Sequence, residues 1–244
     1  MSTEYDTTPT ADPGIEAREA HWDRRANGFD TDFTQAPVRE QVLDQISRQL
    51  PTEPCTALDA GTGSGRTMAR LIQGLHPESD IVGCDLSPAM LHQARVHAPH
   101  KARGSLSFVY ADLCALPFDD GGFDLVVSTF TLHHVPPTQQ LAVLRELRRV
   151  LGEDGMLILA DQVQPDPPLS VEAMRAAVAE TFYPHLPHAE AVGLLSTYGE
   201  WPLTVGELTD LLEAAGFGCE VTDIHRIVAI ATATPGHAHP RGRQ

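Results

Sequence analysis

The chain alternates short apolar runs with helix-like segments from residue 55 to residue 160, and this alternation limits the folds open to it. The apolar runs are CTALD (55–59), IVGCD (81–85), LSFVY (106–110), FDLVVS (123–128) and GMLILA (155–160). The segments between them that read as helices are 66–75, 88–98 and 141–151. Strands that alternate with helices predict a parallel sheet with helices on both faces.

The C-terminal part follows a different pattern. In TVGELTDLLEAAG, Thr204 and Glu207 form a capping box and Gly216 is placed to end the helix. The apolar runs 219–224 and 226–233 follow with almost no gap, which is too short for a crossover helix and predicts an antiparallel hairpin. The expected fold is α/β: a Rossmann-like three-layer sandwich with a mostly parallel seven-stranded sheet.

The segments outside this alternation divide the chain. Residues 1–13 and 236–244 are polar and are expected to be disordered tails of a single domain, 14–235. Residues 14–36 would form an N-terminal cap, and PVREQVLDQISRQL (37–50) an amphipathic helix. The insert 164–203 holds a helix-like stretch, VEAMRAAVAETF, and a loop rich in aromatic residues and histidine. We expect it to form a helical lid.

The composition of the chain limits the classes of binding partner to be expected. With 17 basic and 33 acidic residues the net charge is −16, which disfavours nucleic acid and anionic membranes. The N-terminus lacks a signal-peptide pattern and no apolar run reaches membrane-spanning length, so a cytoplasmic location is expected. The four cysteines lack CxxC spacing and the histidine-rich stretches lack a carboxylate framework, so we expect no metal.

A glycine-rich turn follows the first predicted strand, in LDAGTGSG. Gly61, Gly63 and Gly65 leave the backbone bare where open α/β sheets bind their ligands, at the carboxyl ends of the strands. The third glycine comes one residue too early for the dinucleotide fingerprint, and Arg66 takes its place. Asp85 ends the second strand, where a carboxylate can accept both ribose hydroxyls, and Asp112 follows the third.

These features together resemble the class I S-adenosylmethionine-dependent methyltransferases of the small-molecule type. LDAGTGSG is similar to the first motif of that family and GCDLSPAMLHQA to its acidic ribose motif. The later stretches ADLCALPF, DGGFDLVVSTFTLHHV and LRRVLGEDGMLIL resemble the segments that follow. The match runs from about residue 55 to residue 160.

The resemblance implies a set of cofactor contacts with S-adenosylmethionine. Asp59 would face the cofactor ammonium, Asp85 the ribose, and Asp112 the adenine amino group. The other positions that match family cofactor contacts are Trp22, Gly61, Thr62, Gly63, Gly65, Leu86, Met90, Leu113, Ser128 and Thr129. Phe29 stands where the family usually has tyrosine, which removes a hydroxyl contact, and Thr62 replaces a common cysteine.

The acceptor side carries a weaker pattern. His133 and His134 in TLHHV could remove a proton from the acceptor, or one of them could be a packing residue. A helical turn would point them about 100° apart, so we expect His133 to face the pocket and His134 to lie beside Phe130. The residues expected to contact the acceptor, or else to pin the insert to the core, are Phe29, Phe130, Tyr183, His185, Tyr198 and Trp201.

The function expected from the resemblance is methyl transfer to a small molecule, in the biosynthesis of a natural product. The alternative is a protein of the same fold that binds the cofactor without transferring methyl, as a cyclase, a decarboxylase or a partner subunit. A nicotinamide-dependent oxidoreductase is disfavoured by the position of Arg66 and by the C-terminal hairpin. The chain is expected to be a monomer or a homodimer.

Overall fold

A computed structural model describes residues 14–26, 36–100, 103–194 and 200–236. Seven strands form one sheet in the order β3-β2-β1-β4-β5-β7-β6, parallel except for β7, which runs antiparallel to β5 and β6. The strands are β1 (Thr56–Ala60), β2 (Asp80–Asp85), β3 (Leu106–Tyr110), β4 (Phe123–Thr129), β5 (Leu151–Gln162), β6 (Phe217–His225) and β7 (Val228–Pro235). The predicted fold class and the C-terminal hairpin are confirmed.

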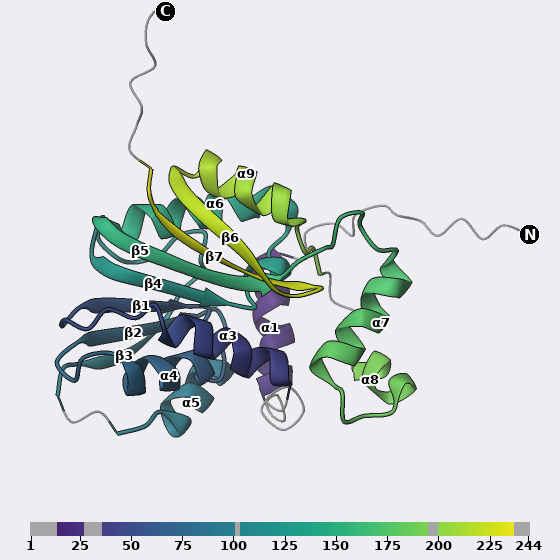
Figure 1. Ribbon diagram of the computed structural model, residues 1–244. Coiled ribbons are helices and arrows are strands. Elements are labelled where there is room, and N and C mark those ends of the chain that lie inside the picture. Colours follow the sequence, from purple (N-terminus) through teal and green to yellow (C-terminus); the bar gives the residue numbers. More distant parts are fainter. Residues whose placement is uncertain (1–13, 27–35, 101–102, 195–199, 237–244) are drawn as a thin grey trace, which may run out of the picture.

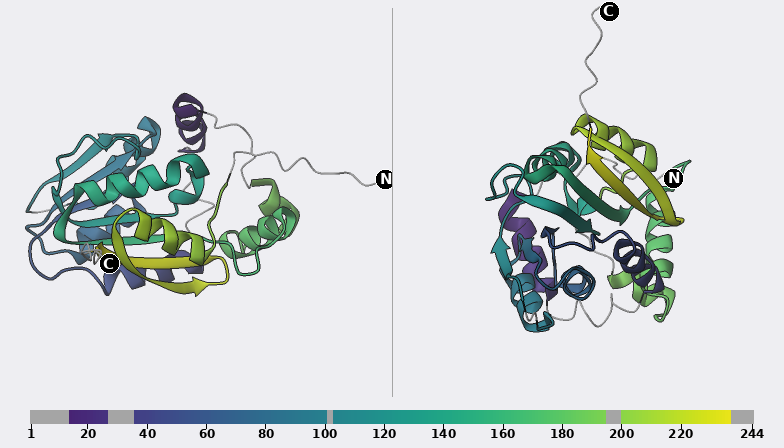
Figure 2. Two further views of the ribbon diagram at one scale, coloured as in Figure 1. Left: turned by 90° about the horizontal axis from the view of Figure 1, so that it is seen from above. Right: turned by 60° about the vertical axis from the view of Figure 1, so that its left-hand side comes forward.

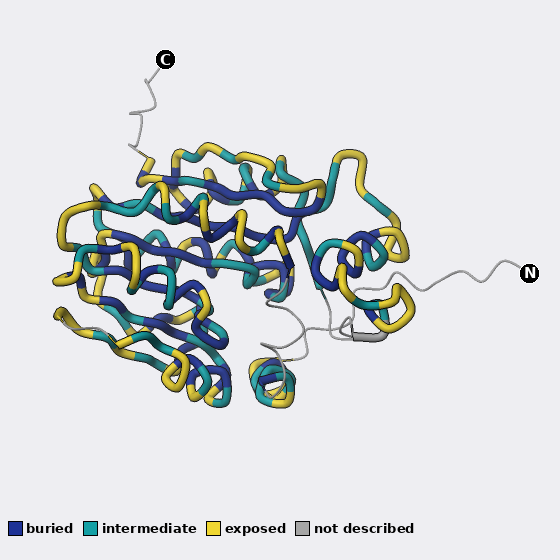
Figure 3. Tube along the Cα trace, turned by 60° about the horizontal axis from the view of Figure 1, so that its bottom comes forward, coloured by how far each residue is buried: buried dark blue, intermediate teal, exposed yellow. Residues whose placement is uncertain are grey.

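Helices cover both faces of this sheet (Figure 1). They are α1 (Gly14–Ala26), α3 (Pro37–Ser47), α4 (Arg66–Gly74), α5 (Pro88–His97), the 3-10 helix η1 (Leu132–His134), α6 (Pro137–Val150), α7 (Val171–Phe182), α8 (His188–Leu194) and α9 (Val205–Ala214). Alternate residues of a strand point to opposite faces, so Ala57 packs with α3 and α4 while Leu58 packs with α6 and α9. The central strands are buried between the two helical layers (Figure 3).

Capping side chains and one glycine set the ends of α5 and α9. Ser87 caps α5, because its hydroxyl accepts a hydrogen bond from the backbone N–H of Met90 at 3.1 Å. Thr204 and Glu207 form the predicted capping box of α9. Gly216 has a φ of +94°, which ends α9 in the left-handed conformation that favours glycine.

Some elements differ from those read from the sequence. Helix α6 begins at Pro137, four residues before the expected start, because proline is favoured in the first turn of a helix. Strand β5 spans Leu151–Gln162 rather than 155–160, with a register shift against β4 after Phe123. A short helix, α8, occupies part of the insert that was expected to be a loop.

The N-terminal helix and the insert lie beyond the carboxyl ends of the parallel strands. Figures 1 and 2 show α7 and α8 standing off this end of the molecule, with α1 near the same edge. Among the described residues, no helix is long and apolar enough to cross a membrane. Of the predicted tails 1–13 and 236–244, all residues but Gly236 lie outside the described residues. The division into cap, domain and insert stays a prediction.

Candidate active site

A cavity opens at the carboxyl ends of the strands, between the sheet, α1, α3 and α7. The glycine loop, the end of β2 and the turn after β4 form its floor. The residues that line it are Arg18, Trp22, Arg25, Arg39, Gly61, Thr62, Gly63, Ser64, Arg66, Thr67, Asp85, Leu86, Met90, Asp112, Leu113, Thr129, Phe130, Thr131, His133, His134, Val135, Gln162, Val178, Phe182, Tyr183 and Glu200.

The three glycines of the loop have different neighbours, although each has a positive φ. A Cβ atom added to Gly61 would lie 2.4 Å from the Thr131 hydroxyl, and one added to Gly65 would lie 2.9 Å from the Ala94 Cα of α5. Those two glycines allow close packing inside the protein. A Cβ added to Gly63 would meet no described atom within 4 Å, so Gly63 presents bare backbone to the cavity.

Asp59 lies directly beneath this loop. Its side chain is fully buried, and one carboxylate oxygen accepts a hydrogen bond from the Thr62 hydroxyl at 2.6 Å. Among the described residues, the other oxygen, Oδ1, has no hydrogen-bond partner. Burial is the main cause that raises the pKa of Asp59 to about 7. Asp59 is not part of the cavity lining, so its predicted contact with an ammonium group stays a prediction.

Asp85 joins the loop to the next strand. One of its oxygens accepts from the backbone N–H of Gly63 and the other from that of Ser87, both at 2.9 Å. Burial raises the pKa of this carboxyl above its ordinary value, against the effect of these hydrogen bonds. The backbone N–H of Leu86 also interacts with this carboxylate. A carboxylate has about four lone-pair sites, so Asp85 can hold the loop and still accept a hydroxyl from the cavity.

The end of the cavity near β3 is formed by the residues predicted to hold the adenine. Leu86, Met90 and Leu113 line it, and Asp112 lies 3.9 Å from the guanidinium of Arg18 on α1. A second oxygen of Asp112, Oδ1, accepts the backbone N–H of Cys114 at 3.0 Å. The structure therefore brings together the three apolar residues and the aspartate that were predicted to contact the adenine.

Helix α1 closes this end of the cavity and is held by polar contacts. Asp23 accepts hydrogen bonds from the Ser87 hydroxyl and from the backbone N–H of Ala89, so it adds a second cap to α5. The Tyr110 hydroxyl donates to Glu19 at 2.7 Å. The predicted cofactor residue Trp22 lines the cavity and packs edge-on against His134, with 4.6 Å between ring centroids.

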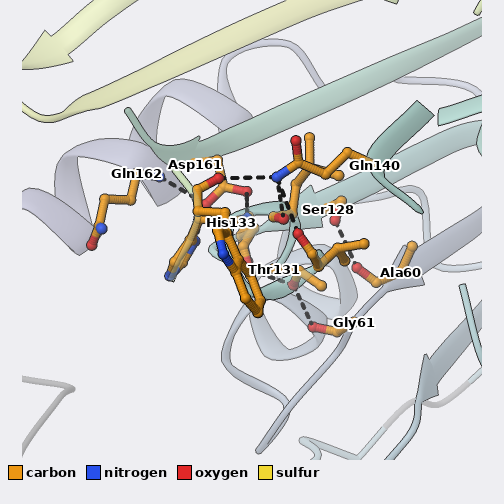
Figure 4. A network of polar contacts seen from close by, with 12 residues as sticks. Ala60, Gly61, Ser128, Thr131, His133, Gln140, Asp161 and Gln162 are labelled. Carbon is orange, nitrogen blue, oxygen red and sulfur yellow. Dashed lines mark hydrogen bonds and ion pairs between the residues drawn. The ribbon is translucent and has the colours of Figure 1, made fainter. Parts of the chain in front are cut away.

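The two hydroxyl residues at the end of β4 have separate positions. Thr129 lines the cavity, and its hydroxyl lies 2.7 Å from that of Thr67 on α4. Ser128 is buried behind the cavity wall, where its hydroxyl donates to the Ala60 carbonyl at 2.9 Å (Figure 4). This hydrogen bond links β4 to β1. Ser128 does not line the cavity, so the structure does not place it for the predicted cofactor contact.

The turn that carries the two histidines differs from the expected helical turn. Phe130 has a φ of +50° and the 3-10 helix η1 follows. As a result His133 and His134 both line the cavity, with their ring centroids 3.8 Å apart, instead of pointing in different directions. His134 lies against Trp22 and also lines the cavity, so the expectation that only His133 faces the pocket was wrong.

His133 belongs to a buried network that sequence reasoning missed. Its Nδ1 is hydrogen-bonded to the carboxylate of Asp161, at the end of β5, and its backbone N–H donates to the same carboxylate at 3.1 Å (Figure 4). Gln140 of α6 donates from Nε2 to the carbonyls of Val135 and Trp201 at 3.1 and 2.9 Å, which anchors the turn. Both Asp161 and Gln140 are buried.

The surroundings of the two imidazoles shift their pKa values in opposite directions. Burial has the largest effect on His133 and lowers its pKa, but the charge and hydrogen bond of Asp161, with Glu200, raise it above the ordinary value overall. Burial and the neighbouring His133 hold the pKa of His134 well below its ordinary value. His133 is therefore the stronger base of the pair.

One wall of the cavity is largely apolar. Phe130 packs edge-on against Phe182 of α7, with 5.4 Å between centroids, and the Arg39 guanidinium lies over the Phe130 ring at 4.8 Å. Val178 and the predicted acceptor residue Tyr183, which is buried, complete this wall. A buried amide, Gln162, lies at the same end of the cavity.

Other residues expected to contact the acceptor lie elsewhere. His185 follows Pro184 after the end of α7, where the chain turns to the surface; it is exposed and does not line the cavity. Trp201 lies behind His133, where its backbone N–H donates to the His133 carbonyl at 2.7 Å. Phe29 and Tyr198 lie outside the described residues.

A substitution at Gly63 tests whether the bare backbone serves a ligand. Gly63→Val would place a branched side chain in the open part of the cavity, so we expect the affinity for S-adenosylhomocysteine to fall by more than tenfold, or about 1.4 kcal/mol. The left-handed backbone should cost about 1–2 kcal/mol of stability. Titration calorimetry and urea unfolding measure both. Unchanged affinity would show that the loop is only a turn.

Two further glycines provide the comparison for that experiment. Gly61→Ala forces a side chain onto Thr131 and should mainly lower the free energy of unfolding. Gly206 is exposed at the start of α9 and does not line the cavity, so Gly206→Val should leave ligand affinity unchanged.

The described residues contain no group of three or more His, Cys, Asp or Glu side chains placed to hold a metal ion.

A family model for a methyltransferase domain matches residues 57–155. The chain is 32% identical over 209 residues to a demethylmenaquinone methyltransferase of Beutenbergia cavernae, covering 80% of each chain. It is 30% identical to a malonyl-[acyl-carrier protein] O-methyltransferase of Laribacter hongkongensis, covering 86% of this chain and 66% of that protein.

Solved structures agree with the fold. A complex of DhpI with S-adenosylhomocysteine superposes with a TM-score of 0.67 at 20% identity, covering 93% of this chain and 98% of that one. This chain thus has the glycine loop, the acidic residues at the strand ends and this order of strands. It is also similar in sequence to methyltransferases over most of its length. The chain belongs to the class I S-adenosylmethionine-dependent methyltransferases.

Proposed function

We propose that this protein transfers the methyl group of S-adenosylmethionine to a small-molecule acceptor, an intermediate in the biosynthesis of a natural product. One observation carries the proposal: a single cavity joins the glycine loop and the end of β2 to a histidine that is paired with a buried carboxylate. The same cavity therefore holds groups suited to binding the cofactor and a group suited to taking a proton.

The residues present fit this cofactor. Gly63 leaves open space for a ligand against the backbone, and Asp85 keeps acceptor capacity toward hydroxyls. Asp59 has a buried oxygen that no described residue satisfies, beneath the loop where the family places a cationic ammonium group. When bound, S-adenosylmethionine supplies an electrophilic methyl carbon on a leaving sulfur. The chain then has to orient the acceptor, exclude water and accept a proton.

The apolar wall of the cavity and the net charge of the protein favour a small-molecule acceptor. The wall formed by Phe130, Phe182 and Tyr183 suits an apolar body, which is typical of small-molecule sites. The net charge of −16 opposes nucleic acid. Relatives named for demethylmenaquinone and malonyl-[acyl-carrier protein] are consistent with a metabolic acceptor.

A methyl-transfer screen tests this function. Purified protein is incubated with S-adenosylmethionine labelled in the methyl group and with fractions of a metabolite library, and the labelled product is identified by mass spectrometry. The Gly63→Val variant is the negative control. Bound S-adenosylhomocysteine in the purified protein, without transfer to any fraction, would favour the alternative of a protein that binds the cofactor without transferring methyl.

A further inference from the structure

The Asp161 carboxylate accepts three hydrogen bonds, two of them from His133. Its two oxygens accept the His133 backbone N–H at 3.1 Å, the Gln162 backbone N–H at 2.7 Å, and the His133 Nδ1–H. The side chain of Asp161 is 3% exposed, and a carboxylate can only accept hydrogen bonds, so the groups around it act as the donors. The proton between Asp161 and His133 therefore belongs to Nδ1.

This arrangement determines the tautomer of the ring. With the proton on Nδ1, neutral His133 carries its lone pair on Nε2, and His133 lines the cavity beside the apolar wall. The ring itself is 6% exposed, and Gln140 anchors the turn from behind, so the imidazole has little freedom to rotate. A base held in this way is useful only if the acceptor carries a proton that has to leave.

We propose that Asp161 is a positioning residue that holds His133 with Nε2 toward the acceptor, and that the acceptor is a weak acid, a phenol, an enol or an activated C–H. This inference rests on the proposed function and narrows its substrate class. Carboxylates and thiolates have no proton to lose at neutral pH, and a neutral amine can attack before it loses one. Those acceptors would gain nothing from a histidine held in this way.

The step balances with the groups present. The acceptor's X–H bond breaks and its proton moves to Nε2 of His133. The electron pair of that bond forms the new bond to the methyl carbon, while the carbon–sulfur bond breaks and leaves its electrons on sulfur. His133 becomes an imidazolium paired with the Asp161 carboxylate, and the proton later leaves to solvent.

The first test measures the tautomer and needs no acceptor. Two-dimensional ¹⁵N NMR of histidine-labelled protein, saturated with S-adenosylhomocysteine, distinguishes protonated from unprotonated ring nitrogens, and a His133→Gln sample assigns the signals. We expect Nδ1–H in the neutral ring. In Asp161→Asn the amide has one acceptor oxygen in place of two, so the Nδ1–H form should lose population. A wild-type ring protonated on Nε2 would overturn the proposal, even if the variant does not fold.

The second test uses the acceptor found in the screen. The charged groups facing His133 are Asp161 on β5, Glu200 before α9, Arg39 on α3 and the adjacent His134. Turnover should rise with pH as His133 loses its proton. In Asp161→Asn that rise should move to lower pH, because an anionic partner is lost, and the plateau should fall by about 10²–10⁴-fold. The KM for S-adenosylmethionine should stay unchanged.

The position of the transferred methyl completes the test. Label on a phenolic or enolic oxygen, or on carbon, supports the proposed acceptor class, whereas label on nitrogen, sulfur or a carboxylate overturns it. Absence of any transfer would count against the proposed function, and the tautomer measurement would still decide the role of Asp161. An Asp161→Asn enzyme with an unshifted pH profile would make Asp161 a packing residue.

Discussion

Replacing His133 by glutamine is expected to lower turnover by about 10²–10⁴-fold, the usual contribution of a general base. The loss should appear in kcat, because His133 lines the cavity and is hydrogen-bonded to Asp161, whereas Asp85 is the residue bonded to the glycine loop. The affinity for S-adenosylhomocysteine should stay within about threefold, which corresponds to roughly 0.6 kcal/mol. Glutamine is preferred to alanine because its amide can still donate to the buried Asp161.

Two further histidines make that result interpretable. His134→Gln removes the ring that packs against Trp22, and it should lower stability more than turnover because the low pKa of His134 makes it a weak base. His225→Gln, on the exposed end of β6, should leave both quantities unchanged. Steady-state turnover against pH and thermal unfolding measure these effects. Full activity in His133→Gln would leave positioning of the acceptor as the whole mechanism.

Replacing Asp85 by alanine should weaken the binding of S-adenosylhomocysteine by about 2–4 kcal/mol, through the loss of charge-assisted hydrogen bonds. That is roughly a 30-fold to 10³-fold change in Kd. Asp85 also accepts the backbone N–H groups of Gly63 and Ser87, so the variant should lose stability as well, by about 1–3 kcal/mol. Titration calorimetry below the unfolding temperature separates the two effects.

Asp85→Asn provides the matched comparison. The amide keeps one acceptor oxygen and nearly the same shape, so its loss of affinity should be about half that of the alanine variant, as expected for neutral hydrogen bonds. Asp80 lies at the opposite end of β2, where its carboxylate accepts hydrogen bonds from Ser105. Asp80→Asn should therefore leave ligand affinity unchanged. Equal Kd values for wild type and Asp85→Ala would refute the ribose assignment.

Features encoded by neighbouring residues were predictable from the sequence. The alternation of strands and helices, the C-terminal hairpin and the capping box at Thr204 all depend on patterns a few residues long, and each was confirmed. The pairing of Asp161 with His133 joins residues 28 positions apart and depends on how β4 and β5 align. A usable signal was nevertheless present, because Asp161 and Gln162 are polar residues directly after the apolar run LILA.

The errors have similar physical causes. The spacing of His133 and His134 was read as an α-helical turn, but the positive φ of Phe130 and a 3-10 turn place both rings in the cavity. His185 and Trp201 were selected by residue type alone. Their positions depend on where α7 ends and on a backbone hydrogen bond to the His133 turn, which composition does not encode.

The acceptor wall and the glycine loop come from separate stretches of the chain. Val178, Phe182 and Tyr183 all belong to α7 or the residue directly after it, within one insert between β5 and α9. The contacts among Gly63, Asp85 and Ser87 lie within residues 63–87 and involve none of this insert. Evolution can therefore exchange the insert, or vary three positions on and directly after α7, and change the range of acceptors while the glycine loop and its acidic partner are inherited intact.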